Sequence, residues 1–176
     1  MGGRIFVNYR RTDSDSYALS IARYLEREFG ATRVFIDVDR IKAGQKFPII
    51  LEEKLAQCAV MLAVIGARWL DTLDEKTSTR RLDNPEDWVR LEIERALARG
   101  IPVIPVCVAG AGLPDRSALP PSMRPMLDHH AASITTAGFR HEMGGLARDL
   151  REMLAGGLPL KKIAAAAGAV AVLGVL

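Results

Sequence analysis

The chain has 176 residues, the size of one domain, and its 49% hydrophobic residues are enough to build a core. Its net charge of +3 is small and no dense basic block stands out, so nucleic-acid binding is not indicated. The two cysteines, Cys58 and Cys107, lie in apolar stretches and are expected to be buried thiols of a reducing compartment. A disulfide framework is therefore excluded, and the three histidines show no ligand spacing with the cysteines that would indicate a metal site.

The first part of the chain alternates predicted strands and helices. Residues 4–9 have the pattern of a short buried strand, and residues 10–13 that of a polar turn. Ser14 or Asp15 is predicted to cap a helix that continues to Phe29. The next predicted elements are a strand at residues 33–37, a loop at 38–47 with Gly44 as its turn residue, a helix at 48–57 and an apolar strand at 59–65.

The second part begins with a mostly polar segment, residues 66–83, that is predicted to be irregular. Asn84 is predicted to cap the following helix, with Pro85 at its first position, and the helix is expected to end at residues 99–100. Two prolines in the strand predicted at residues 101–108 favour bulges or an outer place in the sheet. The remaining predictions are one helical turn at residues 123–127, a weak strand at 131–134 and an amphipathic helix at 139–154.

Strands and helices that alternate in this way predict an α/β fold, a flavodoxin-like five-stranded parallel sheet with helices on both faces. In such sheets, ligands bind beyond the carboxyl ends of the strands. The predicted segments at that edge are residues 9–11, residues 37–47, the loop after Ile65 and the start of the helix after Asn84. Candidate site residues are therefore sought there.

The end of the chain has a different composition. Residues 1–155 are predicted to form the domain, residues 156–162 a linker, and residues 163–176 an apolar segment of Ile, Ala, Gly, Val and Leu only. That segment is shorter than the roughly 20 residues of a spanning helix. We interpret it as the start of a transmembrane helix, truncated or marginal in length; the alternative is a small-residue helix that packs or frays. Lys161 and Lys162 would mark its near side as cytoplasmic. The expected location is a cytoplasmic domain, without a signal peptide, tethered to a membrane.

Trp88 and Glu92 are four residues apart and would be neighbours on one face of a helix. Val89 and Ile93 are better candidates for the face of this helix that packs against the core. The ordinary interpretation of the pair is a half-buried tryptophan beside a solvated glutamate. The alternative is a functional pair, in which an indole and a carboxylate hold a flat cationic ring and the bond next to it.

Four segments in order carry a family resemblance: Phe6–Arg11, Val34–Asp37, Ala43–Gly44 and Trp88–Glu92. Together they resemble the Toll/interleukin-1 receptor (TIR) domain, and most closely the bacterial and animal TIR domains that cleave NAD. The resemblance covers roughly residues 4 to 155. One departure is Asn8, where a serine is common, and because the position lies within a strand we expect it to have little effect.

The resemblance implies that Glu92 is the catalytic residue and that the loop around residues 42–47 gates the site and contacts other subunits. The substrate-binding residues it implies are Tyr9, Arg10, Arg11, Asp37, Lys42, Gly44, Phe47 and Trp88. No metal or cofactor is expected, because NAD⁺ would be the substrate. The implied partners are NAD⁺ and other TIR domains in a homo-oligomer, with roles in signalling or defence.

The chemistry of NAD⁺ cleavage fits these residue types. Nicotinamide is cationic while bound to ribose and leaves neutral, so no general acid is needed, and Glu92 alone could stabilise an oxocarbenium-like ribose. Trp88 could stack on a ring, and Arg10 or Arg11 could pair with the pyrophosphate. The alternative interpretations are a solvated turn for the arginines, a turn cap for Asp37 and a core position for Phe47. Water or an adenine nitrogen could reach the ribose first, so linear and cyclic ADP-ribose both remain open.

A second class of function is a non-enzymatic TIR scaffold that acts through TIR–TIR contacts of the charged loop at residues 39–46. Adaptors do not need the pair of Trp88 and Glu92, so this pair favours the enzyme. A phospho-acceptor receiver domain is rejected because the third predicted strand ends at Ile65-Gly66, with no acid. No glycine fingerprint for a dinucleotide and no P-loop is present.

Overall fold

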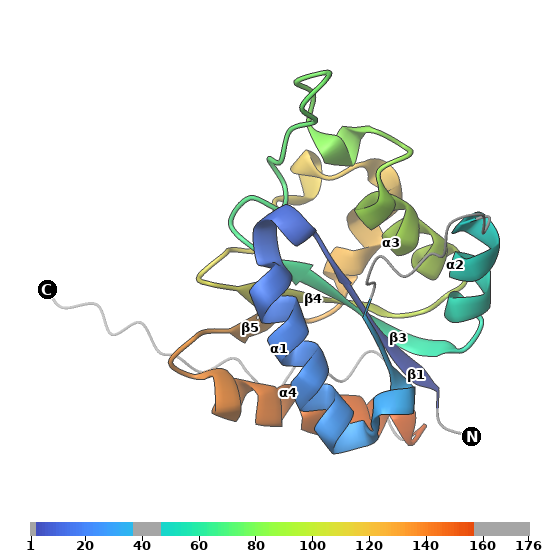
Figure 1. Cartoon of the computed structure of the whole chain (residues 1–176), viewed down its shortest axis with the longest axis vertical. Coiled ribbons are helices and arrows are strands. Elements are labelled where there is room, and N and C mark those ends of the chain that lie inside the picture. The colour runs from blue at the N-terminus through green and yellow to red at the C-terminus, as the bar shows by residue number, and fades with distance from the viewer. Residues whose placement is uncertain (1–2, 37–46, 157–176) are drawn as a thin grey trace, which may run out of the picture.

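The computed structural model describes residues 3–36 and 47–156, which form a five-stranded parallel sheet in the order β2-β1-β3-β4-β5 (Figure 1). The predicted flavodoxin-like α/β fold is thus confirmed. The strands are β1 (Arg4–Tyr9), β2 (Val34–Ile36), β3 (Cys58–Ile65), β4 (Val103–Val108) and β5 (Ala132–Ile134). The α-helices are α1 (Arg11–Phe29), α2 (Phe47–Leu55), α3 (Trp88–Ala98) and α4 (Phe139–Leu154). Short 3₁₀ helices lie at Ala31–Arg33, Arg81–Asp83, Arg116–Ala118 and Pro121–Asp128.

Two hydrophobic cores lie on opposite faces of the sheet, and the alternation of side chains along β1 shows how they are divided. Ile5, Val7 and Tyr9 pack in the core shared with α1 and α4. Phe6 packs in the other core, together with residues of α2 and α3. Helices therefore cover both faces, and a residue's position in β1 decides which pair of helices its side chain meets (Figure 1).

For the proline-containing strand, bulges or an outer place in the sheet are predicted, and the outer place is wrong. β4 begins at Val103 and lies between β3 and β5. Pro105 is opposite Ala63 of β3, while β5 pairs only with Val106, Cys107 and Val108. Proline has no N–H to donate to a neighbouring strand. The prolines are tolerated because Pro102 precedes β4 and Pro105 precedes the residues that pair with β5.

The first helix begins earlier than predicted, at Arg11, and Ser14 is a non-helical residue inside it. The carbonyl of Arg10 accepts hydrogen bonds from the backbone N–H groups of Asp13 and Ser14. The Asp13 carboxylate does not cap the helix; it accepts from the backbone N–H groups of Gly66 and Arg68 at 2.9 and 2.8 Å. This contact ties the start of α1 to the end of β3, at the carboxyl edge of the sheet.

Burial favours the protonated form of both cysteines. Burial raises the pKa of Cys58 to about 11, and burial also raises the pKa of Cys107. Cys107 is buried as predicted, whereas Cys58 is half-buried. Because the thiolate is the reactive form, neither residue is suited to nucleophilic chemistry.

The expected membrane tether needs correction. Across residues 3–36 and 47–156, no helix is both long enough and apolar enough to cross a membrane. This finding overturns the location inferred from the sequence, and the apolar segment at residues 163–176 lies outside the described residues. The division into a domain at 1–155, a linker and an apolar segment stays a prediction.

Candidate active site

The candidate site lies where α3 begins beside the end of β1. The cap of α3 is Asp87, whose carboxylate accepts from the backbone N–H of Arg90 at 3.2 Å. The predicted start at Asn84 and Pro85 is therefore three residues too early. The side chain of Asn84 instead accepts from the backbone N–H of Glu86 at 2.9 Å, which forms a turn before the helix.

A buried ion pair fixes this helix start to the sheet. The two terminal nitrogens of Arg10 donate to the two oxygens of Asp87 at 3.0 and 2.9 Å, and both side chains are 4% exposed. Arg81 approaches the same carboxylate at 3.6 Å from the exposed side. The structure therefore does not present the Arg10 guanidinium to a pyrophosphate; it uses Arg10 to position α3.

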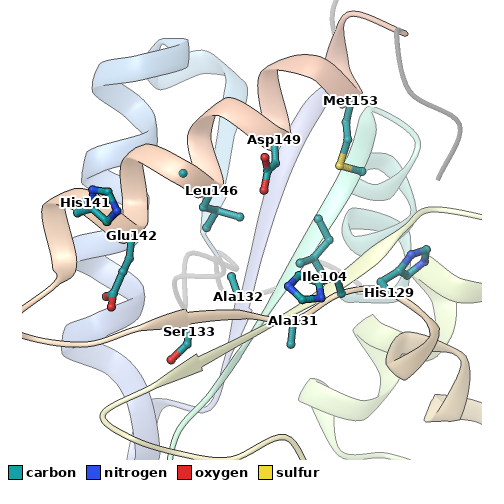
Figure 2. A pocket seen from close by; sticks show the side chains of 12 residues that line it. Ile104, His129, Ala131, Ala132, Ser133, His141, Glu142, Leu146, Asp149 and Met153 are labelled. Atoms are coloured by element: carbon teal, nitrogen blue, oxygen red, sulfur yellow. The ribbon is translucent and has the colours of Figure 1, made fainter. Parts of the chain in front are cut away.

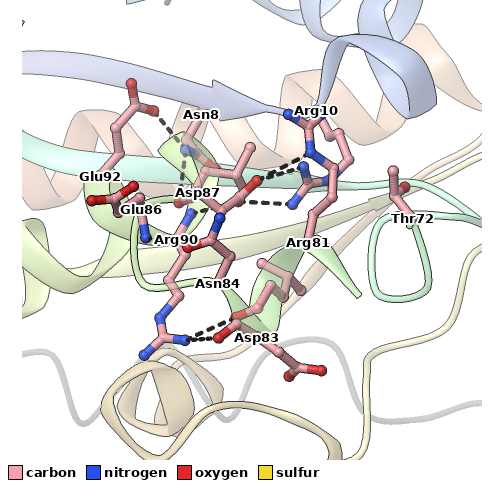
Figure 3. Close-up of polar contacts among 12 residues, drawn as sticks. Asn8, Arg10, Thr72, Arg81, Asp83, Asn84, Glu86, Asp87, Arg90 and Glu92 are labelled. Atoms are coloured by element: carbon pink, nitrogen blue, oxygen red, sulfur yellow. Dashed lines mark hydrogen bonds and ion pairs between the residues drawn. The ribbon is translucent and has the colours of Figure 1, made fainter. Parts of the chain in front are cut away.

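Glu92 lies one turn into α3 and faces the sheet, at 2% exposure (Figure 3). Its Oε2 accepts a hydrogen bond of 2.7 Å from Nδ2 of Asn8, the residue of β1 next to Tyr9. The ordinary interpretation of Glu92 as a solvated residue is therefore wrong. A buried carboxylate is stabilised only when it is hydrogen-bonded or paired, and Asn8 provides one such bond.

Asn8 is the site residue that the sequence reasoning missed. We expected little effect from it, yet it is fully buried and joins β1 to α3. A signal was present, because Asn8 has the same side-chain direction as Phe6 and the opposite direction to Tyr9. A polar residue on the face that a helix covers needs a hydrogen-bond partner from that helix.

Trp88, one turn before Glu92 at the start of α3, is 46% exposed. Somewhat less than half of the Trp88 surface is therefore open to solvent, next to the helix turn whose carboxylate is buried. This arrangement leaves indole surface open for contact with a ligand or with another protein. Both uses are consistent with the enrichment of tryptophan in binding sites.

Tyr9 is separated from Glu92 by the sheet. Tyr9 packs in the core of α1 and α4, on the other face from Asn8. Burial raises the pKa of Tyr9, the nearby Asp15 adds to this rise, and Arg11 opposes it. Arg11 is the exposed first residue of α1. The structure brings these two residues together, but it does not bring Tyr9 to the face that holds Glu92.

The other predicted substrate-binding residues are not described in full. Asp37, Lys42 and Gly44 lie outside the described residues. Phe47 is the first residue of α2, and its side chain is not described. Their roles stay predictions.

A separate groove between β5 and α4 contains all three histidines, His129, His130 and His141 (Figure 2). Glu142, one of its two acidic residues, accepts a hydrogen bond of 2.6 Å from the backbone N–H of Thr135. Within residues 3–36 and 47–156, no group of three or more His, Cys, Asp or Glu side chains could hold a metal ion. None of the residues that line this groove belongs to the site beside α3.

Comparisons with known proteins agree with this architecture. A solved structure, the TIR domains of the activated Roq1 resistosome directly recognizing the pathogen effector XopQ, matches with a TM-score of 0.61 at 10% sequence identity. The match covers 84% of this chain and 99% of that chain, and it shows a common fold. The family model of the TIR domain matches residues 5–143. The chain therefore belongs to the TIR domain family. A search of curated proteins found no match.

Proposed function

We propose that this protein is an NAD⁺ nucleosidase that cleaves the bond between nicotinamide and ribose. The observation that supports the proposal most is the arrangement of two side chains in the first turn and a half of α3. This part of the helix carries an exposed indole, Trp88, and a buried carboxylate, Glu92, that is anchored at the carboxyl end of β1. This is the edge of a parallel sheet at which ligands bind.

The reaction needs few protein groups. The glycosidic C–N bond breaks with its electron pair going to the nicotinamide nitrogen, which loses its positive charge. The ribose carbon becomes oxocarbenium-like, and the Glu92 carboxylate stabilises that developing charge. Water then adds and loses a proton to give ADP-ribose, or an adenine nitrogen adds to give a cyclic product. Because Glu92 is 2% exposed, residues around it must move before the ribose can reach it.

Trp88→Ala is expected to lower NAD⁺ turnover while changing the free energy of unfolding by less than about 1 kcal/mol, because the side chain is 46% exposed. The substitution would remove the stacking of the indole on the nicotinamide or adenine ring. Turnover and urea unfolding of the full chain measure the two effects separately. A loss of several kcal/mol in stability would instead identify Trp88 as a core residue.

The main test compares nicotinamide release by the wild-type chain with that by Glu92→Gln, which keeps the side-chain shape and removes the charge. We expect release to fall by about 100-fold or more, as when a charge-stabilising group is removed from an active site. Glu94→Gln is the matched control on the same helix, since Glu94 lies outside the contact with Asn8 and forms a part-buried ion pair with Arg90 at 2.7 Å. It should retain turnover. Full release by Glu92→Gln would disprove the assignment.

Self-assembly and a role in immune signalling are part of the proposal. The family and the TIR domains of the resistosome that share this fold support association with other TIR domains. The assay should therefore include high protein concentration, with assembly followed by light scattering. The burial of Glu92 against Asn8 also fits a non-enzymatic scaffold, in which the contact only stabilises α3. Assembly without nicotinamide release would favour that scaffold.

A further inference from the structure

The Asn8 side chain is a polar group in the middle of a core, with no exposed surface. It lies between β1 and α3, and its Nδ2 donates both to Oε2 of Glu92 at 2.7 Å and to the carbonyl of Val89 at 3.3 Å (Figure 3). We propose that Asn8 is a positioning residue that holds the Glu92 carboxylate for the reaction. This inference rests on the proposed function.

The hydrogen bonds define the orientation of the Asn8 amide. A carboxylate oxygen and a backbone carbonyl are both acceptors, so the end of the amide that meets them must be the NH₂ group. Each of its two protons has one acceptor. Rotation of the amide would break both bonds at once. The contact therefore fixes the position of Glu92 relative to β1, which carries Asn8, and relative to α3, which carries Val89.

Stability alone does not explain an asparagine here. Its Oδ1 is buried and has no hydrogen-bond partner among the described residues. A buried acceptor without a hydrogen bond lowers the stability of the fold, and an apolar side chain of similar size would not have this desolvation penalty. Phe6, which has the same side-chain direction in β1, is the kind of residue that packing alone would favour. A residue that breaks a packing rule next to a candidate active site is expected to serve that site.

Positioning has a direct effect on rate. A carboxylate that stabilises an oxocarbenium-like carbon must be held close to it, and a displacement of about 1 Å can lower the rate by about 100-fold. A hydrogen bond to the carboxylate also favours its ionised form. Asn8 therefore affects both the geometry and the protonation of Glu92, and a merely structural residue would not change the second property.

The experiment uses two variants of the full chain. Asn8→Ala removes the hydrogen-bond donor, and Asn8→Ser keeps a donor on a shorter side chain. In Asn8→Ala, kcat should fall by about 10- to 100-fold with little change in KM, and the acidic limb of the pH–rate profile should move to higher pH. Asn8→Ser should recover part of kcat. Val106→Ala is the matched control, a buried truncation in the core of α1 and α4, and it should leave the pH–rate profile in place. Unchanged kcat in Asn8→Ala would overturn the proposal.

A second measurement does not depend on activity. The titration of the Glu92 side-chain carboxyl can be followed by ¹³C NMR in wild type and in Asn8→Ala. Loss of the amide donor should move its midpoint to higher pH, because the ionised form loses a hydrogen bond. An unchanged midpoint would overturn the positioning role. A shifted midpoint in a chain that releases no nicotinamide would support the contact between Asn8 and Glu92 and reject the proposed function.

Discussion

Asp87→Ala is expected to lower the free energy of unfolding by about 3–5 kcal/mol, the usual loss when one partner of a buried ion pair is removed. The guanidinium of Arg10 would remain buried without the carboxylate that it contacts through both terminal nitrogens. The helix α3 would also lose its cap at the backbone N–H of Arg90. Urea unfolding of the full chain, followed by circular dichroism, measures the loss.

Two variants separate the causes. Asp87→Asn keeps a good capping side chain and removes the charge. It should therefore still show most of the loss in unfolding free energy that is expected for Asp87→Ala. The double variant Arg10→Met with Asp87→Asn removes both charges and should be more stable than Asp87→Asn alone. If Asp87→Ala loses less than about 1 kcal/mol, the pair behaves as an exposed ion pair and does not anchor α3.

The same ion pair connects the fold to the candidate site. It joins the residue after β1 to the residue before α3, and Trp88 and Glu92 follow directly. A shift in the start of α3 would move both side chains. Loss of NAD⁺ turnover in an Asp87 variant would therefore not identify Asp87 as a catalytic residue.

The sheet could be predicted from the sequence because its signals are local. Residues 59–65 are apolar throughout, as expected of a central strand covered on both faces, and the structure places β3 at the middle of the sheet. The last helix was predicted at residues 139–154, and α4 has these bounds. Strict periodicity over a whole element specifies its type and its buried face without knowledge of its neighbours.

The site could be predicted only in part because its decisive contacts are distant in sequence. Asn84 and Pro85 have ideal local features for a helix start, but Arg10 holds Asp87 and so sets the start there. The burial of Glu92 depends on Asn8, in a different element. A pattern within one segment does not reveal a hydrogen bond between two segments.

The segment at residues 66–83 is where prediction from sequence was weakest. Its polar sequence predicts an irregular segment, and the structure is indeed mostly irregular there, but the pattern does not reveal that Trp69 and Leu82 are fully buried. They pack in the same core as Val89 and Ile93 of α3. A short antiparallel contact between Leu73 and Arg80 closes the segment on itself. The segment is thus anchored from its two ends, and it carries Arg81 toward Asp87.

Trp69→Ala is therefore expected to cost about 3–5 kcal/mol of unfolding free energy, as for other large-to-small changes in a core. Trp69→Phe is the matched control. It keeps an aromatic ring and removes an indole N–H that has no hydrogen-bond partner within the described part of the chain, so it should cost less than half as much. Urea unfolding followed by circular dichroism gives both values, since the substitution removes a fluorescent group. Equal losses in the two variants would mean that the indole nitrogen has a partner, and a negligible loss in Trp69→Ala would mean that the segment is not anchored through the core of α3.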